Sequence, residues 1–223
     1  MTTDLGLSGK RVVVTGAAGG LGRAFAQAFA GAGAQVLACD VNLAGCQETA
    51  ALTGGLAAEV DVTNTASCHA LADLASARMG GVDVLVNNAA LYGGLERRNF
   101  EDLDEDVWDK VMAVNVKGVW QMCRAFSPAL RASKGAIVNI ASATVFSGSP
   151  QWMHYVASKG AVIGLSRTMA KEMGADGVRV NVLAPGFTMT EASLGLMENA
   201  RSYGVDRAAL KRAAEVEDIV GGA

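Results

Sequence analysis

The sequence predicts a single α/β domain built on a doubly wound parallel sheet. Six short runs of apolar and β-branched residues recur along the chain, and Ala-rich stretches long enough for helices separate them. Most of the runs lack strict alternation, which is typical of strands buried on both faces of a parallel sheet. Repeated alternation of strand and helix indicates a doubly wound sheet. The expected strands are 11–16, 34–40, 56–62, 82–89, 135–142 and 178–185.

The first element is a strand that turns through glycines into a helix. Gly16, Gly20, Leu21 and Gly22 form this turn. Such a turn directs backbone amides and a helix N-terminus toward a pyrophosphate, and glycine is required where a Cβ would obstruct it. A turn that exists only for close packing is the alternative. The βαβ context favours dinucleotide binding, so we expect 1–223 to be one dinucleotide-binding and catalytic domain.

The second strand ends at an acid, Asp40. A carboxylate about 20 residues beyond the glycine turn can accept hydrogen bonds from an adenosine ribose 2′-OH and repels a 2′-phosphate. No Arg or Lys lies at 17–20 or 41–45 to offset that repulsion. An ordinary turn or helix-cap Asp is the alternative. The predicted cofactor is therefore NAD.

The later elements bring three reactive side chains together. The longest expected helices are 104–132 and 152–175, and the second places Tyr155 and Lys159 four residues apart on one face. A nearby ammonium group favours the phenolate, so Lys159 is expected to lower the pKa of Tyr155. Ser142 ends the fifth strand, and the carboxyl ends of parallel strands form the ligand crevice. A solvated helix face is the alternative for the Tyr/Lys pair. His154 points elsewhere on the helix and is expected at the pocket rim or surface.

These motifs together resemble the short-chain dehydrogenase/reductase family over nearly the whole chain, and the resemblance implies a Rossmann-like fold. "TGAAGGLG" at 15–22, "DV" at Asp61 and Val62, "NNAA" at 87–90 and "PGFTMT" at 185–190 match its motifs in order. Ala90 replaces a glycine of the family pattern, which adds only a methyl group. The resemblance implies cofactor contacts from Asp61, Val62, Asn87, Pro185, Gly186 and Thr188, with Thr188 holding the nicotinamide carboxamide.

The resemblance also implies a mechanism. Tyr155 would exchange the proton of the alcohol, Ser142 would hydrogen-bond the substrate oxygen, and Lys159 would hold the nicotinamide ribose. Asn115, in "VNVKG", would position a water chain leading to Lys159. The expected function is hydride transfer between NAD(H) and a secondary alcohol or ketone. A catalytically silent dinucleotide-binding regulator on the same fold is the alternative, although a regulator needs no proton-transfer set.

The substrate is less well defined by the sequence. An irregular stretch at 187–212 is expected to be the substrate loop. Met153, Met189 and Met197 could line a pocket or fill the core, and both readings stay open. The expected pocket lining favours an apolar or cyclic alcohol, and it comprises Leu91, Tyr92, Thr144, Val145, Trp152 and Phe187.

Bulk properties exclude several other classes. The net charge is −3 with no basic block, which argues against nucleic acid as a partner. No secretory signal or apolar run of about 18 residues is present, so neither secretion nor membrane insertion is expected. No metal site is expected, because the chain has two His and no CxxC pair. Reduced thiols in a cytoplasmic protein are the expected state of the four cysteines, which are Cys39, Cys46, Cys68 and Cys123.

The end of the chain differs from the family pattern. Family members continue after a segment like "EVEDIV" through a helix into a last parallel strand, whereas this sequence stops at "EDIVGGA". We therefore expect the last strand to be missing here and the natural polypeptide to be longer. By the same resemblance, the full-length form is expected to be a homotetramer or homodimer.

Overall fold

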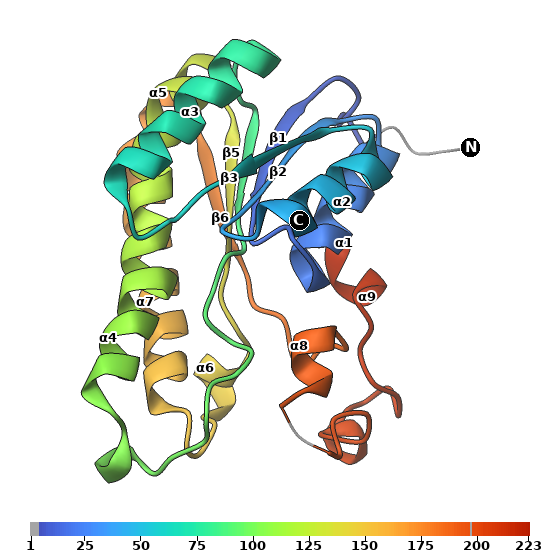
Figure 1. Ribbon diagram of the computed structural model, residues 1–223, viewed down its shortest axis with the longest axis vertical. Helices are drawn as coiled ribbons and strands as arrows, with labels where there is room; N and C mark the ends of the chain where they lie inside the picture. The colour runs from blue at the N-terminus through green and yellow to red at the C-terminus, as the bar shows by residue number, and fades with distance from the viewer. Residues whose placement is uncertain (1–4, 197) are drawn as a thin grey trace.

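The computed structural model describes residues 5–196 and 198–223, and it contains a six-stranded parallel sheet in the order β3-β2-β1-β4-β5-β6 (Figure 1). The doubly wound fold is confirmed. Every predicted strand is present, and each is shorter than its predicted range. The strands are β1 (Arg11–Thr15), β2 (Gln35–Asp40), β3 (Leu56–Glu59), β4 (Val84–Asn87), β5 (Ala136–Ile140) and β6 (Arg179–Leu183).

Helices connect successive strands. The predicted helix at 104–132 consists of α4, a π-helical segment (Ala113–Gly118) and α5 in unbroken succession. The predicted helix at 152–175 is α7. The α-helices are α1 (Gly20–Gly31), α2 (Leu43–Thr53), α3 (Thr65–Met79), α4 (Glu105–Met112), α5 (Val119–Ser133), α6 (Thr144–Ser147), α7 (Met153–Met173), α8 (Glu191–Leu194) and α9 (Glu217–Val220).

Two apolar cores hold the layers together. On one face of the sheet, α3, α5 and α7 bury Leu71, Phe126 and Val162 against the strands. On the other face, α1, α2 and α9 contribute a second core that includes Phe25 and Phe29. Figure 1 shows the two groups of helices on opposite sides of the sheet. Because both faces are covered, the central strands carry apolar residues at successive positions, which explains their lack of alternation.

The segment after β6 is irregular, as the sequence predicts for 187–212. It contains α8 and a 3₁₀ turn (Val205–Arg207), while Met197 lies outside the described residues. A parallel bridge between Thr188 and Ala214 ties the two ends of this segment together, and the Met189 N–H donates to the Ala214 carbonyl at 2.8 Å. Figure 1 shows α8 facing α6 below the sheet. The segment therefore stands over the carboxyl ends of β4 and β5.

The sheet ends at β6, which pairs only with β5 among the strands of the described residues. Beside this strand, Ile219 and Val220 of α9 pack onto the second core. Within the described part of the chain, no helix is both long and apolar enough to cross a membrane.

Candidate active site

The turn between β1 and α1 admits only glycine at its key positions. Gly16 and Gly20 have φ angles of +66° and +51°, which disfavour any side chain. A Cβ on Gly22 would lie 2.1 Å from the Gly16 carbonyl oxygen. The Asn88 side-chain amide donates to the carbonyls of Thr15 and Gly16, both at 3.1 Å. The turn therefore packs against its own backbone, and Asn88, which follows β4, holds it by hydrogen bonds.

The N-terminus of α1 opens onto a large cleft. Gly19, Gly20, Leu21 and Gly22 line this cleft, and a Cβ on Gly19 would meet no atom within 4 Å. No described side chain caps this end of the helix, and no acid lies in its first turn. Free N–H groups at a helix N-terminus and open space above them form a cradle suited to phosphate. This geometry fits the pyrophosphate of a dinucleotide.

The residues predicted for the adenosine lie beside the turn, outside the main cleft. Asp40 accepts a 3.4 Å hydrogen bond from the Ala18 N–H and a 3.0 Å bond from the Asn42 N–H. The carboxylate of Asp61 accepts from the backbone N–H and hydroxyl of Thr63 at 2.8 and 2.7 Å. Val62 is buried beneath Gly118.

The side chains of two predicted site residues are hydrogen-bonded to other residues of the protein. Asn87 is buried within the sheet and donates to Asn139 at 2.8 Å, so its side chain does not line the cleft. Asn115 lies in the π-helical segment, fully buried. Its amide donates to Ser158 at 3.1 Å and to the Leu91 carbonyl at 3.2 Å, and its oxygen accepts from the Leu91 N–H at 2.7 Å. The π-helical geometry, which is frequent at functional sites, is a feature that the sequence pattern does not reveal.

Ser142, Tyr155 and Lys159 all line the cleft. Ser142 follows β5 by two residues, and its neighbour Ala143 donates a backbone hydrogen bond to the Pro185 carbonyl at 2.9 Å. The Lys159 ammonium donates to the Ile140 carbonyl at 2.8 Å. Pro185, Gly186 and Thr188 line the same cleft from beyond β6, where the Thr188 hydroxyl donates to the Gly186 carbonyl at 3.1 Å.

The expected effect of Lys159 on Tyr155 is not seen. Burial raises the pKa of Tyr155 well above that of a free tyrosine, and the charge of Tyr92 adds to this, while a hydrogen bond with Ser142 acts in the opposite direction. The Lys159 nitrogen is 5.7 Å from the centre of the Tyr155 ring and bonded to a carbonyl instead. Burial also lowers the pKa of Lys159 to about 8. The sequence prediction was wrong for this state because both side chains are buried, and burial disfavours the charged form of each.

The cleft has a volume of about 1000 Å³. Of the expected lining, Tyr92, Thr144, Trp152 and Phe187 are present, whereas Leu91 and Val145 do not line it. Met189 lines the cleft, and Met153 does not. An aromatic group surrounds the catalytic candidate, because the Tyr155 ring centre lies 5.5 Å from Tyr92 and 5.2 Å from Trp152.

The prediction for His154 was wrong. This side chain is fully buried. It shares a helix face with Ser158 and Val162, which point into the protein. Desolvation accordingly lowers the pKa of His154, which disfavours its charged form.

Sequence reasoning also missed the residues that brace the site. The Arg23 guanidinium donates to the Ala18 carbonyl at 2.5 Å, to Thr49 at 2.9 Å and to Glu48 at 2.8 Å, so it joins the glycine turn to α2. Thr15 accepts hydrogen bonds from the Asn88 and Ala89 N–H groups, both at 3.1 Å. The described residues contain no group of three or more His, Cys, Asp or Glu that could hold a metal ion.

Comparison with known proteins agrees with this geometry. The short chain dehydrogenase family model matches residues 10–200. The chain is 36% identical over 224 residues to a probable galactose dehydrogenase of Rhizobium meliloti, covering 96% of this chain and 86% of that protein. It is 40% identical over 194 residues to the D-threitol dehydrogenase of Mycolicibacterium smegmatis, covering 84% and 74%.

A solved structure shares the fold. The 3-ketoacyl-(acyl-carrier-protein) reductase from Brucella melitensis, complexed with NADH, superposes with a TM-score of 0.91 at 29% identity, covering 97% of this chain and 89% of that one. The matched residues include the glycine turn, Ser142, Tyr155 and Lys159. This chain belongs to the short-chain dehydrogenase family.

Proposed function

We propose that this short-chain dehydrogenase transfers a hydride between NAD(H) and a secondary alcohol or its ketone, with Tyr155 as the proton-transfer group. The observation that carries the proposal is that Ser142, Tyr155 and Lys159 line the same cleft as the phosphate-binding turn. An alcohol in this cleft can reach both hydroxyl groups and a cofactor seated on α1. The cofactor class is nicotinamide dinucleotide.

In alcohol oxidation, Tyr155 as phenolate would take the hydroxyl proton of the substrate. In ketone reduction, its phenol would return that proton to the carbonyl oxygen. Ser142 would donate a hydrogen bond to the same oxygen and stabilise the negative charge that develops there. The Thr144 hydroxyl donates to the Ser142 oxygen at 3.0 Å, and Ser142 is in turn hydrogen-bonded to Tyr155, so the substrate oxygen would be received between these two hydroxyl groups.

When bound, a nicotinamide would supply the hydride chemistry, and its oxidised form would add positive charge to the cleft. Lys159 would hold the nicotinamide ribose, and Thr188 would hold the carboxamide, with Pro185 and Gly186 forming the adjoining backbone. Lys159 is fixed by its bond to the Ile140 carbonyl, so its remaining protons can point into the cleft. A positive charge beside Tyr155 would counteract the effect of burial on its pKa.

Proton release would follow the buried polar residues behind Lys159. Asn115 would help to orient a water chain there, and its side chain is held by Leu91 and Ser158. Since that amide already makes three hydrogen bonds, we propose that Asn115 contributes to the water chain through its backbone.

We propose NAD in preference to NADP. Asp40 lies beside the Ala18 N–H of the glycine turn, where a 2′-phosphate would meet a negative charge. Arg23 is bonded to this turn through the Ala18 carbonyl, and Glu48 already pairs with this arginine at 2.8 Å. Like-charge juxtaposition of this kind discriminates by roughly several kcal/mol.

Assembly and location are also proposals. The exposed Trp120 on α5 supports a homodimer or homotetramer. All four cysteines are buried free thiols, which supports a reducing compartment such as the cytoplasm. Sedimentation and fractionation of the native protein test these points.

The test of the function is formation of NADH from a panel of secondary alcohols, followed by absorbance with either cofactor. Oxidation with NAD that is lost in Tyr155→Phe supports the proposal. Tight NADH binding without turnover of any alcohol or ketone would instead favour the catalytically silent regulator.

A further inference from the structure

We infer that the alcohol carries an anionic group, a carboxylate or a phosphate, which Arg97 binds at the mouth of the cleft. The inference rests on the proposed function, because it names the substrate class of that same site. Its basis is an exposed cation that lines the cleft and lies over the aromatic wall that leads to Tyr155.

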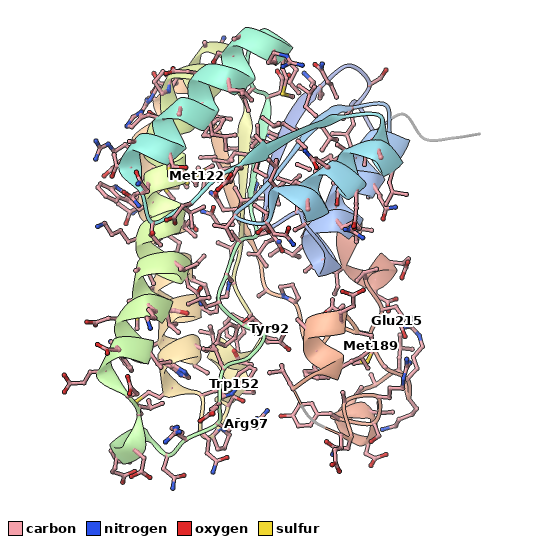
Figure 2. All side chains as sticks on the ribbon, viewed as in Figure 1. Tyr92, Arg97, Met122, Trp152, Met189 and Glu215 are labelled. Carbon is pink, nitrogen blue, oxygen red and sulfur yellow. The ribbon has the colours of Figure 1, made fainter. Side chains whose placement is uncertain are left out.

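Arg97 continues the aromatic wall outward. Its guanidinium carbon lies 5.0 Å from the centre of the Trp152 ring, and that ring is 5.2 Å from Tyr155. Tyr92 packs edge-on against Trp152 at 5.4 Å. Figure 2 shows Tyr92, Trp152 and Arg97 in one column on the side of the cleft that faces Met189. One molecule can thus react at Tyr155 and still reach Arg97.

The loop that carries Arg97 is hydrogen-bonded to Gln151, just before the start of α7. The Arg98 N–H donates to the Gln151 carbonyl at 3.1 Å, and the Gln151 amide donates to Asn99 at 3.3 Å. Gln151 adopts a left-handed backbone conformation with φ of +67°, which is uncommon for a non-glycine residue. These bonds hold the backbone beside Arg97, and the exposed Arg97 guanidinium lies over the Trp152 ring at the mouth of the cleft.

The charge of Arg97 is available. The adjacent acid, Glu96, pairs with Arg98 at 2.5 Å. Among the described residues, no ion pair is formed by Arg97, whereas Arg212, which also lines the cleft, pairs with Asp218 at 2.5 Å. The charge of Arg97 also acts on the cleft wall. Burial raises the pKa of Tyr92, and the charge of Arg97 offsets part of that rise.

The chemistry of this group points to an oxyanion. A guanidinium presents donors in a planar fork that matches a carboxylate or phosphate with two parallel hydrogen bonds. The aromatic wall holds the carbon part of the same molecule. Glu191, at the start of α8, is an acid that lines the cleft and would repel an anion placed beside it. An anionic substrate is therefore directed to the Arg97 side.

The experiment compares charged and neutral alcohols in matched pairs. 4-Hydroxypentanoate is paired with its methyl ester, and glycerol 3-phosphate with glycerol, so that the carboxylate and phosphate sources are distinguished. For at least one pair, the wild-type kcat/KM should be at least about 10-fold higher for the anion. Arg97→Gln should reduce kcat/KM for that anion by about 10- to 100-fold, chiefly through KM, as expected for a charge-assisted hydrogen bond. The neutral partner should change by less than about threefold.

Arg124→Gln is the matched control, because Arg124 also stacks on a tryptophan, Trp120, at 5.4 Å but does not line the cleft. It should leave both members of each pair unchanged. Arg97→Lys should restore part of the preference for the anion, since it keeps the charge and loses the fork. If Arg97→Gln does not fold, the wild-type preference itself should still decline as NaCl is raised.

Equal or better oxidation of the neutral partners, or of neutral polyols such as D-threitol, with no effect of Arg97→Gln would overturn the inference and leave the proposed function intact. Absence of turnover with every alcohol, charged or neutral, would remove the proposed function and the inference together.

Discussion

Replacing Lys159 by Met should change how the stability of the apoprotein depends on pH. Lys159 is 3% exposed, and burial lowers its pKa from 10.5 to about 8. Between these values the native side chain is neutral while the unfolded chain still binds a proton. Unfolding then takes up a proton, so the free energy of unfolding rises with pH through this window. At 1.36 kcal/mol per pKa unit, the full effect is about 3 kcal/mol.

The assay is urea unfolding of both proteins without cofactor at several values from pH 7 to pH 10.5. The difference in unfolding free energy should move by about 3 kcal/mol in favour of the wild type as the pH rises. Loss of the bond to the Ile140 carbonyl and of packing shifts the whole difference curve but not its slope. Lys171→Met, at an exposed lysine of the same helix, controls for the loss of an ammonium group. A difference that stays within about 0.5 kcal/mol over the whole range would refute the assignment of Lys159 as a desolvated cation.

Three further predictions follow from the site. Tyr155→Phe keeps the ring packed between Tyr92 and Trp152; turnover should fall at least about 100-fold while titration still detects NADH binding, and near-normal turnover would contradict the mechanism. Asp40→Ser combined with Val41→Arg should shift the kcat/KM ratio toward NADP, because a cation replaces the repelling carboxylate; an unchanged ratio would place the 2′-OH elsewhere. Gly22→Ala should lower the unfolding midpoint and NADH affinity, because its Cβ would lie 2.1 Å from the Gly16 oxygen; Gly164→Ala, an open position in α7, is the control expected to be neutral or stabilising.

The fold was predictable because its strands are marked by continuous apolar runs. Both faces of β1, β4 and β5 are buried, so the pattern is unbroken and the six strands were found in the right places. Their ends were placed too far out, since the ladders stop at Glu59 in β3 and Asn87 in β4, and Asn88, directly after β4, lines the cleft instead. The π-helical turn around Asn115 has no signature in hydrophobic periodicity, because one inserted residue shifts the phase only locally.

The sequence predicts a site residue where a short motif also has a known place in the parallel sheet. Tyr155 and Lys159 share a helix face, and Ser142 follows a central strand, so the rules of parallel sheets bring them to one cleft. Side chains that brace the turn from a distance in sequence were missed. Arg23 is bonded to Thr49 and Glu48 some 25 residues away, and nothing in the local pattern marks that pairing.

Electrostatics is where sequence reasoning fails, and the reason is physical. Spacing shows that Lys159 is near Tyr155, but it does not show that both are buried, and burial determines the direction of both pKa shifts. The same holds for His154, whose burial could not be read from its position on the helix. In the run Glu96-Arg97-Arg98, the sequence does not show which arginine the acid neutralises. The structure pairs Glu96 with Arg98 and leaves the charge of Arg97 at the cleft.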